Sequence, residues 1–284
     1  MNKISVVLMV YNRKEFYKEA LDSLKEQSDR DFELVIVSNI EIDYDLSVFT
    51  DVNIIPSPES ILDGYLGGMI ASKNDIVAFL DDDDKFVPYK ISFLRSSNIE
   101  GYYHNNYYDF GSQEPHNNGR GFNASCISIN KGAYSGILEM AQQHPLLGMP
   151  DSVIYWYALE HNLPIQIDHS AYLTFYRHKP MKKVYANLLE FVNRQMSALE
   201  EAQGIFKSDK VHEIIREGLI QNQLYLNSLG HYKKISLNEM IWLMRRPVIG
   251  KRGKVMSYFL SLPVWHGIGL KLMANFRATK EVEK

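Results

Sequence analysis

Four consecutive aspartates, Asp81 to Asp84, directly follow an apolar run that ends at Leu80. Their carboxylates repel one another, and a bound divalent cation relieves that repulsion. Because hard oxygen ligands suit Mg²⁺ and Mn²⁺, the cluster predicts a metal site for one of these ions. The alternative is a solvated acidic turn, which is the usual fate of a run of charges. The apolar strand that leads into the cluster favours the metal site.

The first third of the chain must supply the elements that position these aspartates. Apolar, β-rich runs predict strands over residues 4–10, 32–37, 52–55 and 75–80. Helices are predicted after Asn12, which can cap the first of them, and over residues 61–72. This alternation predicts an α/β fold with a mostly parallel sheet and helices on both faces. Ligands bind such sheets beyond the carboxyl ends of the strands, where the aspartates lie.

The rest of the chain divides near residue 180. Before it, residues 101–125 are polar and aromatic and predict irregular structure. Residues 122–129 and 165–176 predict strands, and 131–143 and 151–161 predict helices. After it, nearly all of the signal is helical, with helices expected over 184–204 and 210–229. We therefore expect an α/β domain over 1–180 and a helical extension over 181–284.

Composition narrows the class of protein. The single cysteine among 284 residues excludes an internal disulfide framework and a cysteine-based zinc site, and it fits a reducing, cytoplasmic compartment. The net charge of −3 hides an asymmetry, because residues 231–284 hold 11 Lys and Arg against 3 Asp and Glu. Nucleic acid is a poor fit as a partner, since the remaining body is acidic and no recognition motif occurs in it.

The basic tail, residues 231–284, alternates Lys and Arg clusters with apolar stretches. Its longest uncharged run, Val255 to Leu270, has 16 residues, whereas a membrane-spanning helix needs about 20. The tail therefore predicts peripheral contact with the inner face of a membrane, with Trp242 and Trp265 at headgroup depth. The alternative is a helical bundle whose basic face is solvated or binds an oligomer partner.

Two motifs in the first ninety residues resemble those of a known family. Residues 77–88, Val-Ala-Phe-Leu-Asp-Asp-Asp-Asp-Lys-Phe-Val-Pro, look like the strand and DXD motif of inverting family 2 glycosyltransferases, which have the GT-A fold. Residues 4–13 are similar to that family's first strand and its Tyr-Asn turn, and residues 32–37 resemble its second strand. The resemblance covers roughly residues 3–180. It implies a Rossmann-like, nucleotide-sugar-binding catalytic domain.

The resemblance also assigns roles to matching positions. It implies that Asp83 binds the metal and that Tyr11 lies against the nucleotide base. The residues that it places around the nucleotide are Val10, Tyr11, Asn12, Ser38, Asn39, Asp81 and Asp82. His178, in a Tyr-Arg-x-His element, would complete the metal site, although a lone histidine is more often a surface or core residue.

The sequence departs from the family pattern at two places. Ser38 and Asn39 stand where the family usually has paired aspartates, and an Asn amide or Ser hydroxyl can still accept a hydrogen bond from a base. The stretch Gly64 to Met69 lacks the arginine that commonly helps to bind phosphate. Arg177 is a candidate to replace it.

Asp151 is the candidate catalytic base. Gly148 to Asp151 resembles the family motif whose aspartate takes the proton from the acceptor hydroxyl. The alternative is a plain helix N-cap, for which an aspartate next to a proline is also suited.

Together these features predict a metal-dependent, inverting glycosyltransferase. It would move a sugar from a nucleoside-diphosphate donor to a hydroxyl of a lipid-linked or polysaccharide acceptor at the cytoplasmic membrane face. The acceptor expectation rests on the tail and on an aromatic loop expected near Tyr102 to Tyr108, where sugar rings would stack. The alternatives are a sugar nucleotidyltransferase, which releases pyrophosphate, and a catalytically silent sugar-nucleotide-binding scaffold.

Overall fold

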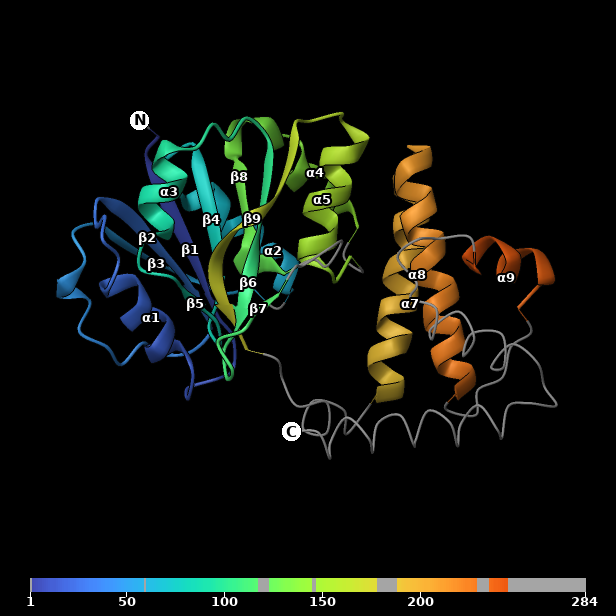
Figure 1. Cartoon of the computed structure of the whole chain (residues 1–284), viewed down its shortest axis with the longest axis horizontal. Coiled ribbons are helices and arrows are strands. Elements are labelled where there is room, and N and C mark those ends of the chain that lie inside the picture. Colours follow the sequence, from blue (N-terminus) through green and yellow to red (C-terminus); the bar gives the residue numbers. More distant parts are fainter. Residues whose placement is uncertain are drawn as a thin grey trace. The chain divides into compact units, whose positions relative to one another are not determined.

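The computed structural model describes residues 2–58, 60–116, 123–144, 147–177, 188–228 and 235–244. The chain forms two compact units, Met1–Pro180 and Met181–Lys284 (Figure 1). The apolar run from Val255 to Leu270, His178 and most of the basic tail lie outside the described residues, so the expectations for them stay predictions.

One half of the sheet in the first unit is parallel. Its strands, in spatial order, are β3 (Val52–Pro56), β2 (Phe32–Ser38), β1 (Ile4–Val10) and β4 (Ile76–Asp81). These bounds confirm the four expected strands to within one residue at each end. The register pairs Val10 with Ser38 and Met9 with Asp81. The carboxyl ends of β1, β2 and β4 therefore lie side by side.

The other half of the sheet is mixed. It continues from β4 through β8 (Ile127–Asn130), β6 (Tyr102–Asp109), β9 (Ile165–Tyr176) and β5 (Lys85–Phe86), with β7 (Pro115–His116) paired to β6. Strand β8 runs antiparallel to both β4 and β6, whereas β6 and β9 are parallel. The strand expected over 122–129 is shorter than predicted, because a 3₁₀ turn over Ala124–Cys126 precedes β8.

The expectation of irregular structure over 101–125 is wrong for the first part of that stretch, because residues 102–109 form strand β6. The strand is central, and Tyr102 and Tyr103 are only 2% and 0% exposed. Its polar residues find partners inside the protein: Asn105 Nδ2 donates to Thr174 Oγ1 (3.2 Å) and Asn106 Nδ2 donates to the His169 carbonyl (2.6 Å). Internal hydrogen bonds thus let the asparagines lie in the sheet, although asparagine has a low strand propensity.

Helices cover both faces of the sheet (Figure 1). The α1 helix (Tyr17–Lys25) and α3 (Lys90–Ser96) pack on the face that holds the even-numbered residues of β1. The α2 helix (Ile61–Ala71) packs on the other face, in contact with α4 (Ile137–Gln143) and α5 (Pro150–Glu160). The close approach of α2 requires Gly68, since a Cβ there would lie 2.4 Å from Val7 Cγ1.

Two details of the predicted helices are wrong. Asn12 does not cap the first helix, because α1 begins at Tyr17 and Asn12 adopts a left-handed conformation with φ of 57°. The helix expected over 131–143 is divided into a 3₁₀ turn over Lys131–Tyr134 and α4. A further 3₁₀ turn spans Leu46–Val48.

The second unit is helical over its described residues. It contains α7 (Leu188–Ile205), α8 (Asp209–Ser228) and α9 (Leu237–Met244). The first two pack along each other (Figure 1). A capping box begins α9: Ser236 Oγ accepts from the Glu239 N–H (3.2 Å), and Glu239 Oε2 accepts from the Ser236 N–H (2.8 Å). None of the helices in the described part of the chain has the length and apolar character that a bilayer span requires.

Candidate functional site

The four aspartates form a tight turn at the carboxyl end of β4. The Asp84 N–H donates to the Asp81 carbonyl (3.2 Å), which folds the run back on itself. One carboxylate oxygen from each of Asp81, Asp83 and Asp84 lies within 4.8 Å of the other two. Asp82, Asp83 and Asp84 are 1%, 5% and 1% exposed. The alternative of a solvated acidic turn is therefore wrong, because three of these side chains are withdrawn from water.

The donor set of this turn fits a divalent cation. Asp84 Oδ1 accepts from the Arg177 N–H (2.9 Å), but Asp84 Oδ2 is buried with no hydrogen-bond partner in the described structure. Burial, together with the charge of Asp81, raises the pKa of Asp84 well above its usual value. Buried and mutually repelling carboxylates are costly unless a cation joins them, and oxygen ligands suit Mg²⁺ and Mn²⁺. The structure thus adds Asp84 and Asp81 to the ligand candidate Asp83.

Arg13 pairs with two of the aspartates and was not assigned a role from the sequence. Its Nη1 lies 2.7 Å from Asp83 Oδ2, its Nε lies 3.2 Å from Asp82 Oδ2, and its Nη2 pairs with Asp82 Oδ1. Despite this ion pair, burial raises the pKa of Asp82 to about 7. The sequence could have indicated a role for Arg13, because this residue directly follows the Tyr-Asn turn at the expected ligand-binding edge of the sheet.

Two hydroxyl groups hold the first aspartate of the turn. The Tyr65 hydroxyl, from α2, donates to Asp81 Oδ1. The Asp81 N–H donates to Ser125 Oγ (2.9 Å). Tyr65 belongs to the stretch of α2 that lacks the family's arginine. In place of an arginine, α2 therefore presents a neutral hydroxyl to Asp81, one of the candidate metal ligands. Neither contact is visible as a motif, because each joins residues far apart in the chain.

The residues expected around the nucleotide lie at the ends of β1 and β2. The Asn12 N–H donates to Asn39 Oδ1 (2.9 Å), and Asn39 Nδ2 donates to Asn12 Oδ1 (2.8 Å), which ties the two loops together. Ser38 Oγ donates to the Ile40 carbonyl (2.7 Å), so this hydroxyl shapes its own turn. The Val10 side chain is fully buried in the core, whereas Tyr11 is half-buried.

Asp151 lies in the first turn of α5. The helix begins at Pro150 with Met149 as its N-cap residue, so the plain N-cap alternative for Asp151 is wrong. Asp151 Oδ1 accepts from the Ser152 N–H (2.8 Å). Withdrawal from water, opposed by this hydrogen bond and assisted by the charge of Asp81, raises the pKa of Asp151 to about 6. Burial raises the pKa of Tyr65, and the charges of Asp81 and Asp151 raise it further.

Arg177 also contacts the aspartate turn, through hydrogen bonds to Asp83 and Asp84. Its Nε donates to the Asp83 carbonyl (3.1 Å) and its Nη2 pairs with Glu19 Oε2 (2.9 Å). The guanidinium carbon lies 3.7 Å from the centre of the Phe110 ring and 5.2 Å from that of Phe16. These contacts make Arg177 an anchor for the turn, which leaves it poorly suited to replace the expected phosphate-binding arginine.

A buried lysine, Lys90, supports the aspartate turn indirectly, through Ser125. Lys90 is 0% exposed, and its Nζ donates to the Ser125 carbonyl (2.7 Å) and to Thr174 Oγ1 (3.1 Å). The same Nζ lies 3.9 Å from the centre of the Phe86 ring. Burial lowers the pKa of Lys90 to about 7. This side chain joins α3 to Ser125, which in turn positions Asp81.

Aromatic side chains border the aspartates where β6 and β9 end. The Tyr107 ring stacks on His116 at 5.5 Å and meets Tyr176 edge-on at 5.1 Å. Burial raises the pKa of Tyr176, as do the charges of Asp84 and Asp81, which places this ring beside the cluster. The expected aromatic loop is therefore replaced by strand-end residues, since Tyr102 and Tyr103 are buried in the sheet.

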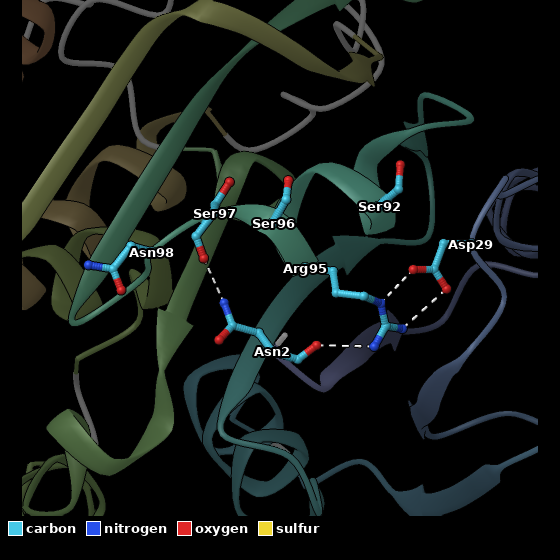
Figure 2. A pocket seen from close by; sticks show the side chains of 7 residues that line it. All are labelled: Asn2, Asp29, Ser92, Arg95, Ser96, Ser97 and Asn98. Atoms are coloured by element: carbon cyan, nitrogen blue, oxygen red, sulfur yellow. Dashed lines mark hydrogen bonds and ion pairs between the residues drawn. The ribbon is translucent and has the colours of Figure 1, made fainter.

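A separate hollow lies at the amino end of β1 (Figure 2). Its lining residues are Asn2, Asp29, Ser92, Arg95, Ser96, Ser97 and Asn98. Arg95 spans it, with Nη2 donating to Asp29 Oδ1 (3.1 Å) and Nη1 donating to the Asn2 carbonyl (3.1 Å). The hollow is remote from the aspartate turn, because that turn follows the carboxyl end of β4, which runs parallel to β1.

Similarity to other proteins agrees with this geometry. Residues 5–95 match the model of the family described as glycosyl transferase family 2. An uncharacterized glycosyltransferase from Nostoc is 28% identical over 115 residues. The GalNAc(5)-diNAcBac-PP-undecaprenol β-1,3-glucosyltransferase from Campylobacter jejuni is 27% identical over 117 residues. These matches cover 36% and 37% of this chain, and they span the same shares, little more than a third, of the two relatives.

Solved structures share the fold. The S. aureus TarS structure in complex with UDP-GlcNAc has a TM-score of 0.56 at 13% identity, and the match covers 92% of this chain and 82% of TarS. Mannosyltransferase PcManGT from Pyrobaculum calidifontis, in complex with GDP-Man and Mn²⁺, has a TM-score of 0.54 at 9% identity, with 95% and 87% coverage. Both have the GT-A fold. Over residues 5–95 the chain is thus similar in sequence to glycosyl transferase family 2, and it shares the GT-A fold of these solved structures.

Proposed function

We propose that this protein is a metal-dependent, inverting glycosyltransferase. It transfers a sugar from a nucleoside-diphosphate donor to a hydroxyl of a lipid-linked or polysaccharide acceptor. The observation that carries this proposal is the convergence of Asp81, Asp83 and Asp84 at the carboxyl end of β4. Similar solved structures bound to UDP-GlcNAc and to GDP-Man with Mn²⁺ support the choice of donor class.

The donor lies across the carboxyl ends of β1, β2 and β4. Tyr11 and the paired amides of Asn12 and Asn39 face the nucleotide, with Asp82 near its ribose. Asp83, joined by Asp81, Asp84 and the sequence-predicted ligand His178, would hold Mn²⁺ or Mg²⁺. When bound, such an ion neutralises the charge that develops on the leaving diphosphate.

Asp151 acts as the general base. The acceptor oxygen attacks C1 of the sugar from the face opposite the diphosphate, so the new C–O bond forms as the bond to the diphosphate breaks. Asp151 takes the proton of the acceptor hydroxyl. With a pKa of about 6, its carboxylate is mostly ionised at neutral pH, yet it is more basic than an ordinary aspartate. Inversion at C1 follows from the single displacement.

The acceptor class is inferred from three features. A relative is named for an acceptor that is linked to undecaprenol through a diphosphate. The strand-end aromatics Tyr107 and Tyr176 offer ring faces for sugars beside the aspartates. The basic tail carries a net charge of +8, which favours peripheral contact with the anionic cytoplasmic face of a membrane.

Co-sedimentation with anionic and neutral vesicles tests this contact, and equal binding to both would contradict it.

A donor panel tests the activity. The full-length protein is incubated with UDP-glucose, UDP-GlcNAc and GDP-mannose, with Mn²⁺ or EDTA, and with a polyprenyl-diphosphate-linked glycan. We expect release of a nucleoside diphosphate with Mn²⁺ only, and a product whose anomeric configuration is opposite to that of the donor. Release of pyrophosphate from a nucleoside triphosphate and a sugar phosphate would indicate a nucleotidyltransferase. Donor binding without turnover on any acceptor would indicate the silent scaffold.

A further inference from the structure

Arg13 forms an ion pair with Asp83, the carboxylate that is the proposed metal ligand. Its Nη1 and Nη2 lie 2.7 and 3.3 Å from the two oxygens of Asp83, and its Nε and Nη2 hold the two oxygens of Asp82. The guanidinium is thus a fork between two adjacent carboxylates, in the bidentate geometry that arginine adopts with carboxylates and phosphates alike. The guanidinium thus supplies a positive charge at the carboxylates that a divalent cation would also neutralise.

The position of Arg13 lets it exchange partners. It lies on the loop between β1 and α1, directly after Asn12, whose backbone is left-handed with φ of 57°. Its side chain is 27% exposed, and the guanidinium carbon lies 5.7 Å from the centre of the Phe16 ring. The same loop carries Tyr11 and Asn12, and Asn12 is hydrogen-bonded to Asn39; these are residues of the proposed nucleotide site. Arg13 therefore stands between the nucleotide edge and the metal candidates, which is where a diphosphate has to lie.

The two other cations that contact the aspartate turn or its support, Arg177 and Lys90, are bound to other partners. The guanidinium of Arg177 lies against Phe110 and pairs with Glu19, and its Nε is bonded to the Asp83 carbonyl. Lys90 is fully buried on Ser125 and Thr174. In α2, the stretch from Gly64 to Met69 contains no arginine or lysine. Of these side chains, Arg13 is therefore the one that can bind a diphosphate at this edge of the sheet.

We propose that Arg13 alternates between two anionic partners. In the donor-free protein it holds Asp82 and Asp83, and when a divalent cation takes Asp83, the guanidinium turns to the donor diphosphate. This inference rests on the proposed function. Its physical basis is that a guanidinium and a divalent cation repel each other and compete for one carboxylate, whereas a diphosphate attracts both. Arg13 therefore opposes metal binding in the absence of nucleotide and favours it in the presence of nucleotide.

The variant Arg13→Gln distinguishes the two effects, because it should strengthen the binding of Mn²⁺ alone and weaken the binding of a nucleoside diphosphate. Titration calorimetry with Mn²⁺ alone should show at least about threefold tighter binding to Arg13→Gln than to the wild-type chain. Titration of UDP or GDP in saturating Mn²⁺ should show about tenfold weaker binding to the variant, as expected for the loss of one charged contact. Uridine and guanosine, which lack the diphosphate, should bind both proteins alike. Arg13→Lys keeps the charge but loses the fork, so both effects should be smaller.

The contrary outcomes are distinct. Unchanged or weaker Mn²⁺ binding by a folded Arg13→Gln variant, with unchanged UDP and GDP binding, would overturn the exchange and make Arg13 a structural clamp. If Arg13→Gln does not fold, Arg13→Met, which also removes the charge, takes its place, and wild-type values in both titrations would likewise overturn the exchange. If the wild-type chain itself binds neither Mn²⁺ nor a nucleoside diphosphate, the proposed function fails instead.

Discussion

Two arginine–aspartate clusters lie at opposite ends of the parallel strands. At the amino end, Arg95 bonds Asp29 and the Asn2 carbonyl (Figure 2). It also bonds the Asp31 carbonyl. At the carboxyl end, Arg13 bonds Asp82 and Asp83. The hydrogen bond from Arg95 lowers the pKa of Asp29, whereas burial raises the pKa of Asp82 to about 7 in spite of Arg13. The same kind of ion pair thus accompanies opposite shifts.

The difference lies in burial and in the balance of charge, and it supports the proposal that the cluster at the carboxyl end is the functional one. Around Arg95 the carboxylate is 22% exposed, and the arginine fork joins three segments of the chain. In the other cluster, four carboxylates lie in one turn, three of them buried, and Arg13 bonds two of them. Such an excess of buried negative charge opposes folding. Its presence at a ligand-binding edge is therefore best explained by a ligand.

The largest expected difference between the two ends is in turnover. Asp151→Asn should lower kcat by roughly 10²–10⁴-fold, the scale of general base catalysis, while donor affinity stays within about twofold. Asp29→Asn, the matched change at the structural end, should leave kcat unchanged. Initial rates of nucleoside-diphosphate release measure both variants. Wild-type turnover in Asp151→Asn would remove the proposed base.

The second difference is in metal binding. Asp83→Asn should weaken Mn²⁺ binding by at least about 10–100-fold, since even the loss of a group behind the ligands has effects of that size. The Mn²⁺ dependence of donor binding should fall with it. Calorimetry with Mn²⁺, with Asp29→Asn as the control, measures this. If Asp83→Asn binds Mn²⁺ as the wild-type chain does, the converging carboxylates are not the metal site.

The third difference is in stability. Arg95→Gln removes the fork that ties the amino end of β1 to Asp29, and hydrogen bonds to charged groups contribute about 1.5–3 kcal/mol. We expect a loss of that order in the free energy of unfolding, measured in urea, with Mn²⁺ and donor affinities unchanged. A lower donor affinity in a variant of normal stability would contradict the assignment of this end as structural.

The smallest difference is in the pH dependence of stability without metal. The lowered pKa of Asp29 favours folding above the unfolded value of about 3.9, and this contribution is lost as pH falls through the folded pKa. The raised pKa of Asp82 favours folding below about 3.9, and that contribution is lost as pH rises to about 7.

Urea unfolding in EDTA therefore should show two opposite trends. Between pH 4 and 7 the wild-type chain should lose up to about 1.4 kcal/mol per pH unit through Asp82. Asp82→Asn should make that slope smaller, although the raised pKa values of Asp84 and Asp151 keep part of it, and Asp29→Asn should reduce the fall below pH 4. Identical slopes in Asp82→Asn and the wild-type chain would show that Asp82 is ionised throughout.

Local sequence was sufficient for the parallel half of the sheet and for β9. Ile4 to Val10 is a continuous apolar run with β-branched residues, which few structures other than a buried strand accommodate. Asp81 to Asp84 directly follow such a strand, and topology alone sends the end of a parallel strand to the ligand-binding edge. Strand β6 escaped prediction because its Tyr, His and Asn residues have little hydrophobic periodicity, and their hydrogen-bond partners are distant in the chain.

The sequence by itself therefore determined the fold class, the edge of the sheet and the residue types that gather there. Only the tertiary structure decided which groups meet: Arg13 with Asp83 across 70 positions, Tyr65 with Asp81, and Lys90 with Thr174 across 84. It also decided that the aspartates are buried, which turns a run of charges into a site with shifted pKa values. The reason is physical: propensity and periodicity act over neighbouring residues, whereas charge pairing and desolvation depend on distances that folding alone creates.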